Sequence, residues 1–229
     1  MGRTRGDLHR LSAHVLGRRR DAVSGHFGLR ASPGGLGTPA FGPEPETLRL
    51  TSASLIREVG TESRRLALAG ATLAELADFA GADLGVEFSA GPGTPALGRI
   101  DEPLELDVKE LDEIFSWFDL GWRVLDQVMA ERPGLGRSAT VQLWPEHFDV
   151  GTTLDLGDGD GDGNQVNLGF SPGDAFSDGP YVYVGPWGPA RPGDDGYWNA
   201  PFGAALCRSL VHDAADGLSF IRAGLERLS

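Results

Sequence analysis

The sequence predicts an α+β fold in which an antiparallel sheet is packed by two long helices, near residues 107–132 and 203–228. Apolar residues recur at helical spacing through both ranges, as they do in helices that bury one face. Between the two helices, apolar residues alternate with polar or small ones over 150–156 and again over 166–170. This alternation predicts a hairpin with one buried face.

The first half of the chain is expected to hold a helix, several short strands and a second helix. The segment 32–46 is predicted to be a loop, because its many prolines and glycines exclude regular hydrogen bonding. The expected elements are helix 6–20, strands 24–31, 47–51, 54–58 and 64–69, and helix Thr72–Ala80.

The helix over 107–132 has the clearest local signals. Asp107 is a good N-cap, and Glu110 three residues later completes a capping box. Pro133-Gly134 ends the helical pattern. Gly121 lies inside and weakens the helix by about 1 kcal/mol relative to alanine, unless a neighbouring side chain packs against it.

The remaining elements of the second half are four strands, a loop and the last helix. The strands are expected near 138–143, 147–156, 164–170 and 181–185, and the loop over 186–201. The last helix is expected to bury Cys207, Leu210, Val211, Ala214, Leu218, Ile221 and Leu225.

Each half therefore contains a helix, about four strands and a helix. Residues 89–103, rich in glycine and proline, are the best linker, which predicts an N-terminal half over 1–100 and a C-terminal half over 101–229. Ser32-Pro33-Gly34 resembles Ser171-Pro172-Gly173, so a duplication with two similar halves is a hypothesis.

The net charge of -13 argues against a nucleic-acid partner, because binding would bring like charges together. Only residues 1–20 are basic, with six arginines. This segment is either an arm that docks on an acidic surface or a basic helix that lies on the protein's own acidic body.

The sequence has no apolar run of the roughly 20 residues that cross a bilayer, and its start lacks the apolar core of a signal peptide. No membrane partner is expected. A single cysteine excludes an intramolecular disulfide, and a cytoplasmic location is the default expectation.

Two motifs resemble known catalytic or cofactor signatures but fail their structural conditions. Gly169-Phe170-Ser171-Pro172-Gly173 matches the nucleophile elbow of hydrolases, yet Pro172 has no N–H for an oxyanion hole. A dinucleotide-like pattern over 35–40 is not followed by a helix. The sequence identifies no cofactor.

Asp158, Asp160 and Asp162 alternate with glycine, which suggests calcium. An EF-hand that starts at Asp158 would have Gly169 where the loop needs glutamate. A solvated hairpin tip is the favoured interpretation, and weak calcium binding stays open.

The candidate site is the segment 144–187. His147 and Asp149 are two residues apart on a predicted strand, so both would project from one face. His147 would act as a base or a metal ligand, with Asp149 orienting the imidazole and Asp174 as a second carboxylate. The other histidines, which a zinc or iron site would need, are remote in sequence. The residues expected to contact a ligand are Trp144, Glu146, Tyr181, Tyr183, Trp187, Trp198 and Asn199.

The chain resembles an uncharacterised bacterial family, a domain of unknown function. The resemblance rests on Trp144-Pro145-Glu146-His147-Phe148-Asp149, Ser171-Pro172-Gly173-Asp174 and Pro180-Tyr181-Val182-Tyr183-Val184. It covers the C-terminal half most clearly and implies a shared fold and shared positions. No reaction comes with it.

Three functions follow as hypotheses. The leading one is a small-molecule-binding protein, extended to an enzyme if His147 is a proton-transfer base. The second is an interaction or self-association module that uses Tyr181, Trp187 and Trp198 as exposed anchors, and the third is a metal-dependent enzyme.

Overall fold

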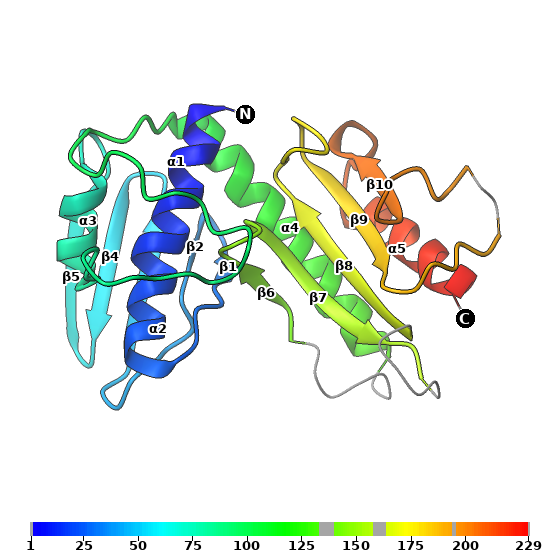
Figure 1. The fold of residues 1–229 in the computed structure, drawn as a ribbon, viewed down its shortest axis with the longest axis horizontal. Helices are drawn as coiled ribbons and strands as arrows, with labels where there is room; N and C mark the ends of the chain where they lie inside the picture. The colour runs from blue at the N-terminus through cyan, green and yellow to red at the C-terminus, as the bar shows by residue number, and fades with distance from the viewer. Residues whose placement is uncertain (1, 133–139, 158–163, 194–195, 229) are drawn as a thin grey trace. The chain divides into compact units, whose positions relative to one another are not determined.

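A computed structural model describes residues 2–132, 140–157, 164–193 and 196–228. The chain divides into two compact units. The first unit contains Met1–Ser116 and Leu143–Phe148, and the second contains Trp117–Gln142 and Asp149–Ser229. Helices and two antiparallel sheets make up both (Figure 1), which confirms the α+β prediction. The unit boundary falls inside a helix, not in the expected linker over 89–103, and independent folding of either half stays a prediction.

The first unit begins with one long helical rod. Helix α1 (Arg3–Leu11) continues through a π-helical segment, η1 (Ser12–Gly17), into α2 (Arg18–Ser24). Leu8, Leu11, Val15 and Leu16 are fully buried. The helix predicted over 6–20 is therefore confirmed and extends further at both ends.

The rod lies across one face of a five-stranded sheet in which every strand pairs with its neighbour in the chain (Figure 1). Helix α3 (Leu73–Ala80) follows the sheet and starts with a capping box between Thr72 and Glu75. The strands are β1 (Arg30–Ser32), β2 (Gly35–Gly37), β3 (Glu46–Thr51), β4 (Ser54–Val59) and β5 (Glu62–Ala67).

Strand β2 corrects the prediction of a loop over 32–46. It pairs with β1 on one side and β3 on the other. A Cβ atom at Gly35 or Gly37 would collide with the carbonyl oxygen of Leu50 or Leu48. Glycine therefore lets two backbones approach closely here. The loop was predicted because glycine is more often found in turns.

The arginine-rich N-terminus lies on the protein's own body. The buried carboxylate of Glu46 accepts from Arg19, at 2.7 Å, and from Arg57, at 2.9 Å. Side chains of the rod also donate to carbonyl oxygens of the coil that follows α3. These oxygens belong to Gly81, Asp83, Val86, Pro95, Leu97 and Arg99.

The second unit packs helices on one face of its sheet. Helix α4 (Val108–Glu131) starts after Asp107, whose Oδ1 accepts the N–H of Glu110, which confirms the predicted N-cap. The N–H of Asp107 donates to Oγ1 of Thr4 and not to Glu110, so the predicted capping box is only half formed. In Figure 1, α4 and α5 (Ala214–Leu228) lie behind the strands. The strands of this sheet are β6 (Gln142–Trp144), β7 (Asp149–Asp155), β8 (Gln165–Ser171), β9 (Tyr181–Pro186) and β10 (Ala204–Cys207), and their spatial order is β10-β9-β8-β7-β6. Leu143 and Trp144 of β6 belong to the first unit. The part of the expected strand 138–143 that precedes residue 140 lies outside the described residues.

The predicted helix over 203–228 is wrong in its first third. Ala204–Cys207 form β10, antiparallel to β9. Helix α5 begins only at Ala214, and Oδ1 of the preceding Asp213 accepts the N–H groups of Ala215 and Asp216. Cys207 is consequently exposed. Leu210 is exposed too, although both were expected to be buried.

The two halves of the chain have the same element order of helix, five-stranded meander and helix. The similar Ser-Pro-Gly turns do not occupy equivalent places. Ser32-Pro33-Gly34 joins the first and second strands of its sheet, whereas Ser171-Pro172-Gly173 follows the third strand of the other. The order of elements, and not this motif, is what the two halves share.

Among the helices of the described residues, none is long and apolar enough to span a membrane.

Gly121 shows how packing overrides helix propensity. A Cβ atom there would lie 2.6 Å from Cγ of Phe170, so we expect Gly121→Ala to lower the free energy of unfolding by about 1–3 kcal/mol. Gly6→Ala in α1, where a Cβ atom meets nothing within 4 Å, should instead raise it by about 0.5–1 kcal/mol. Urea unfolding of both variants tests this. A stabilised Gly121→Ala variant would contradict the packing.

Candidate functional site

The segment that carries His147 is a turn, not a strand. Residues Pro145–Phe148 form the turn, closed by the N–H of Phe148, which donates to the carbonyl of Trp144 at 2.7 Å. Phe148 has a φ of 55°, a left-handed conformation that non-glycine residues rarely adopt. Strand β7 starts only at Asp149. The predicted projection of His147 and Asp149 from one strand face is therefore wrong.

The residues predicted at this turn belong to the first unit. The side chain of His147 is exposed, and its Nδ1 would lie 3.2 Å from a Cβ atom at Gly93. Trp144 is half-buried and Glu146 is buried. The carboxylate predicted to orient the imidazole, Asp149, starts a strand of the second unit.

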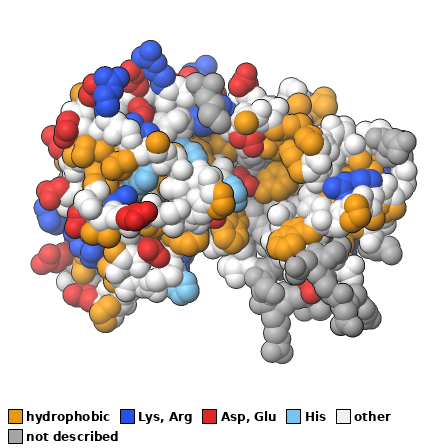
Figure 2. Space-filling view, viewed as in Figure 1, with side chains coloured by type: hydrophobic (Ala, Val, Ile, Leu, Met, Phe, Trp, Pro, Cys, Tyr) orange, Lys and Arg blue, Asp and Glu red, His pale blue; other side chains and the backbone are white. Residues whose placement is uncertain are grey.

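Four of the predicted residues of the second unit, Asp149, Asp174, Tyr181 and Tyr183, come together on the sheet face opposite α4 and α5. Phe170 on β8 contacts Gly121 of α4 and Gly217 of α5, so its neighbours Gly169 and Ser171 point to the opposite face. The strand register places Tyr183 and Gly151 on either side of Gly169. We call this surface, with Asp149, Ser171, Asp174, Tyr181 and Tyr183, the tyrosine face. In Figure 2, hydrophobic side chains gather over β8 and β9 on this side.

Tyr183 reaches across the middle strand to a carboxylate. Its hydroxyl donates to Oδ2 of Asp149 at 2.5 Å, from β9 over β8 to β7. A Cβ atom at position 169 would collide with the tyrosine ring. The glycine of the apparent hydrolase motif therefore makes room for an aromatic ring.

Tyr181 forms a second pair of the same kind. Its hydroxyl donates to Oδ2 of Asp174 at 2.6 Å. The other oxygen of Asp174 accepts the backbone N–H groups of Phe176 and Ser177, which fixes the carboxylate in its turn. The ring of Phe202 lies 6.2 Å from that of Tyr181 and 6.0 Å from that of Tyr183, centroid to centroid.

Burial and the neighbouring carboxylates keep both phenols protonated. Burial, followed by the charge of Asp149 and the hydrogen bond to it, raises the pKa of Tyr183 well above its ordinary value. Burial and the hydrogen bond to Asp174 raise the pKa of Tyr181 as well. Each tyrosine therefore acts as an O–H donor that holds a carboxylate in place.

The remaining predicted ligand contacts have structural hydrogen bonds. The indole N–H of Trp187 donates to Asn167, and that of Trp198 donates to the carbonyl of Pro192. Asn199 donates to the carbonyl of Ala205 and accepts its N–H, which ties the preceding loop to β10. Tyr181 is only 3% exposed, so it cannot be the exposed anchor of the interaction hypothesis, whereas Trp187 is 52% exposed.

The described residues build no metal centre, because no three histidine, cysteine, aspartate or glutamate side chains in them gather to hold an ion. The proposed calcium residues Asp158, Asp160 and Asp162 lie outside the part that the structure describes.

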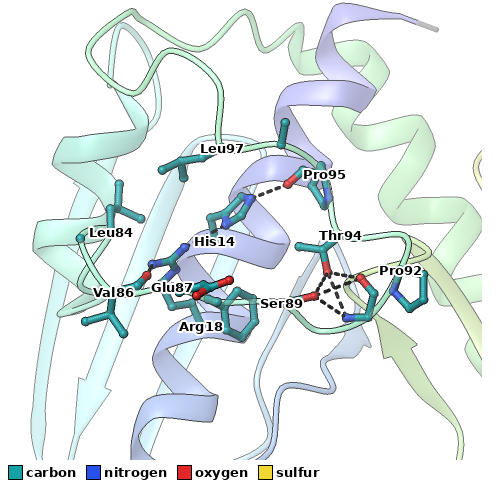
Figure 3. Close-up of a pocket in the computed structure, with 14 residues that line it drawn as sticks. His14, Arg18, Leu84, Val86, Glu87, Ser89, Pro92, Thr94, Pro95 and Leu97 are labelled. Atoms are coloured by element: carbon teal, nitrogen blue, oxygen red, sulfur yellow. Dashed lines mark hydrogen bonds between the residues drawn. The ribbon is translucent and has the colours of Figure 1, made fainter.

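The sequence analysis missed a second polar group of residues, in the first unit. His14 and Arg18 are buried on the rod and line a cavity beneath the coil over 84–97 (Figure 3). Both share the helix stripe of Leu11 and Val15. The sequence does indicate this group, because a histidine and an arginine interrupt an otherwise apolar helix face.

No family model matches the chain, and no curated protein or solved structure is significantly similar to it.

The tyrosines give a spectroscopic test. The sequence contains three tyrosines, and the pKa of each, including the half-buried Tyr197, is raised. We expect almost no tyrosinate absorbance at 295 nm in the folded protein at about pH 10.5, and full titration in urea. Because the unfolded chain loses these protons first, stability should fall as the pH rises above 10. A native titration with an ordinary midpoint would exclude the two pairs.

His9 gives the matching test at low pH. Its ring stacks on Phe148 and hydrogen-bonds the carbonyl of Pro145, and burial lowers its pKa to about 4. The unfolded chain binds this proton first, so stability should fall by on the order of 2 kcal/mol as the pH drops from 6.5 to 4. His9→Gln should flatten this dependence, measured by urea unfolding. His26→Gln, at an exposed histidine after α2, should leave it unchanged.

Proposed function

We propose that the protein binds a small molecule on the tyrosine face of its second unit. The supporting observation is the convergence of the two phenol–carboxylate pairs, Tyr183 with Asp149 and Tyr181 with Asp174. Small-molecule sites typically combine aromatic walls with a few fixed polar groups. Here Phe176 and Phe202 contact the ring of Tyr181 and supply the walls.

The chemistry of these groups favours a ligand that carries hydrogen-bond donors. Carboxylates accept hydrogen bonds and attract positive charge, and aromatic rings accept cations and the C–H faces of polyols. We therefore infer an amine or a polyol. The tyrosines already hold these carboxylates in place, so that binding would lose little side-chain entropy.

The test uses a matched pair of tyrosine variants. Primary amines and polyols are screened against the full chain by ligand-observed NMR, and dissociation constants of the hits are measured for Tyr183→Phe and Tyr197→Phe. Tyr197 lies in the same unit, but its hydroxyl donates to the carbonyl of Phe220 in α5. Loss of one oriented hydrogen bond should weaken binding about tenfold in Tyr183→Phe, with no change in Tyr197→Phe. Equal affinities in the two variants would disprove the proposed location.

The role of His147 as a proton-transfer base is a separate hypothesis about the first unit, and is not part of the site on the tyrosine face. It predicts that His147→Ala abolishes any turnover found for the full chain while leaving the dissociation constants of ligands of the tyrosine face unchanged. The binding proposal itself does not require His147, because its side chain belongs to the exposed turn of the other unit.

Three further points complete the proposal. A cytoplasmic location agrees with the exposed free thiol of Cys207, since thiols persist in reducing compartments. Membership of an uncharacterised bacterial family rests on the motifs at Trp144–Asp149, Ser171–Asp174 and Pro180–Val184.

If the protein instead binds a protein partner or itself, the exposed Trp187 would anchor the contact. Trp187→Ala would then abolish that contact without affecting the binding of small molecules.

A further inference from the structure

The first unit contains a cavity of about 650 Å³ beneath the coil over 84–97. In Figure 3 this coil runs around His14 and Arg18, which project from the helical rod. The volume is within the range of small-molecule sites. Two features of the local backbone also favour a functional site. His14 lies in the π-helical segment η1, and the coil over 84–97 is long and irregular. Both kinds of structure are associated with functional sites.

The charge of Arg18 has no anionic partner at contact distance among the described residues. The residue is 6% exposed. Its Nη1 donates to the carbonyls of Asp83 and Val86, and its Nη2 to Nδ1 of His14. Its Nε is buried and has no hydrogen-bond partner in the described part of the chain. The carboxylate of Asp83 acts on the guanidinium only through space. Since buried charges are usually paired, this guanidinium is a cation without a counterion at contact distance in the described residues.

His14 does not supply or remove charge here. Its Nε2 is 2.7 Å from the carbonyl of Pro95, so Nε2 carries the proton and Nδ1 accepts from Arg18. Burial lowers the pKa of His14, which keeps the ring neutral. The local charge at the cavity floor is therefore that of Arg18.

The wall around this cation is apolar and incompletely covered. Phe88 lies against the guanidinium, with 5.3 Å from its ring centroid to Cζ. Leu84, Phe88 and Leu97 are only half-buried, and Val86 is 61% exposed. Glu87 is the one acidic side chain among the cavity residues that the structure describes, and it is exposed, so solvent weakens its repulsion of a bound anion without removing it.

We propose that this cavity binds a carboxylate with an apolar tail, the carboxylate facing Arg18 and the tail lying on Leu84, Phe88 and Leu97. The anion would provide the missing counterion, and the tail would cover the exposed apolar side chains. This site is independent of the tyrosine face, and neither proposal depends on the other.

The probes are hexanoate and 1-hexanol, which share a tail and differ in charge. Binding to the full chain is measured by saturation-transfer NMR and by titration up to about 10 mM. We expect hexanoate to bind and 1-hexanol to bind at least roughly tenfold more weakly, because the alcohol lacks the charge. Absence of hexanoate binding, or equal binding of the two probes, would overturn the proposal.

Two valines provide a control for charge. Val86→Glu places a negative charge at the cavity, whereas Val108→Glu makes the same change at a valine that is 58% exposed but does not line this cavity. We expect Val86→Glu to weaken hexanoate binding by roughly fivefold or more and Val108→Glu to leave it unchanged. Glu87→Gln should strengthen binding, and Arg18→Gln should abolish it. Because Arg18→Gln could also release the coil, the valine pair decides the question if that variant does not fold. Equal affinities of the two valine variants would refute the site.

Discussion

The first unit depends on the pairing of one helical rod with the carbonyl groups of a long coil. The coil between α3 and α4 contains no strand or helix of its own in the described residues, and buried carbonyl groups left without donors are costly. Arg10, His14, Arg18 and Arg19 supply these donors from one side of the rod. Arginines of the basic N-terminal segment, for which an arm that docks on an acidic surface was one interpretation, therefore bind groups within the fold, and the cavity at Arg18 lies where these contacts meet the apolar wall of the coil.

The second unit depends on a different constraint, which is the space that small residues leave on both faces of its sheet. On the helical face, Gly121 and Gly217 admit the ring of Phe170. On the tyrosine face, Gly169 admits the ring of Tyr183, and only this close approach lets the hydroxyl reach Asp149. The same strand thus positions a core aromatic on one side and a polar pair on the other.

The elements with strong local signals could be predicted from the sequence. Asp107 and the apolar spacing after it located α4, and the alternation around Val150 and Val166 located the hairpin. The errors arose where one residue type serves two purposes. Glycine in β2 permits close strand pairing, and Ala204–Cys207 satisfied a helical pattern although these residues pair with β9.

The sequence could predict the candidate site only in part, because local patterns do not reveal which residues meet across a sheet. Asp149, Asp174, Tyr181 and Tyr183 were all among the predicted site residues, but the pairing of Tyr183 with Asp149 across β8 depends on strand register, which local sequence does not reveal. The role of His147 rested on a strand that Phe148 interrupts with a left-handed backbone conformation, and phenylalanine carries no signal for it. His14 and Arg18 were overlooked because arginine and histidine on a helix are usually solvated.

The dependence of Tyr183 on Gly169 also has an evolutionary consequence. While the tyrosine is present, a mutation to any larger residue at position 169 removes space that the ring occupies, so selection acts on the two sites jointly. In a lineage that has replaced the tyrosine by a small side chain, position 169 is released and can drift. Homologous sequences should then display correlated substitution between these two columns of an alignment, while neighbouring columns vary independently.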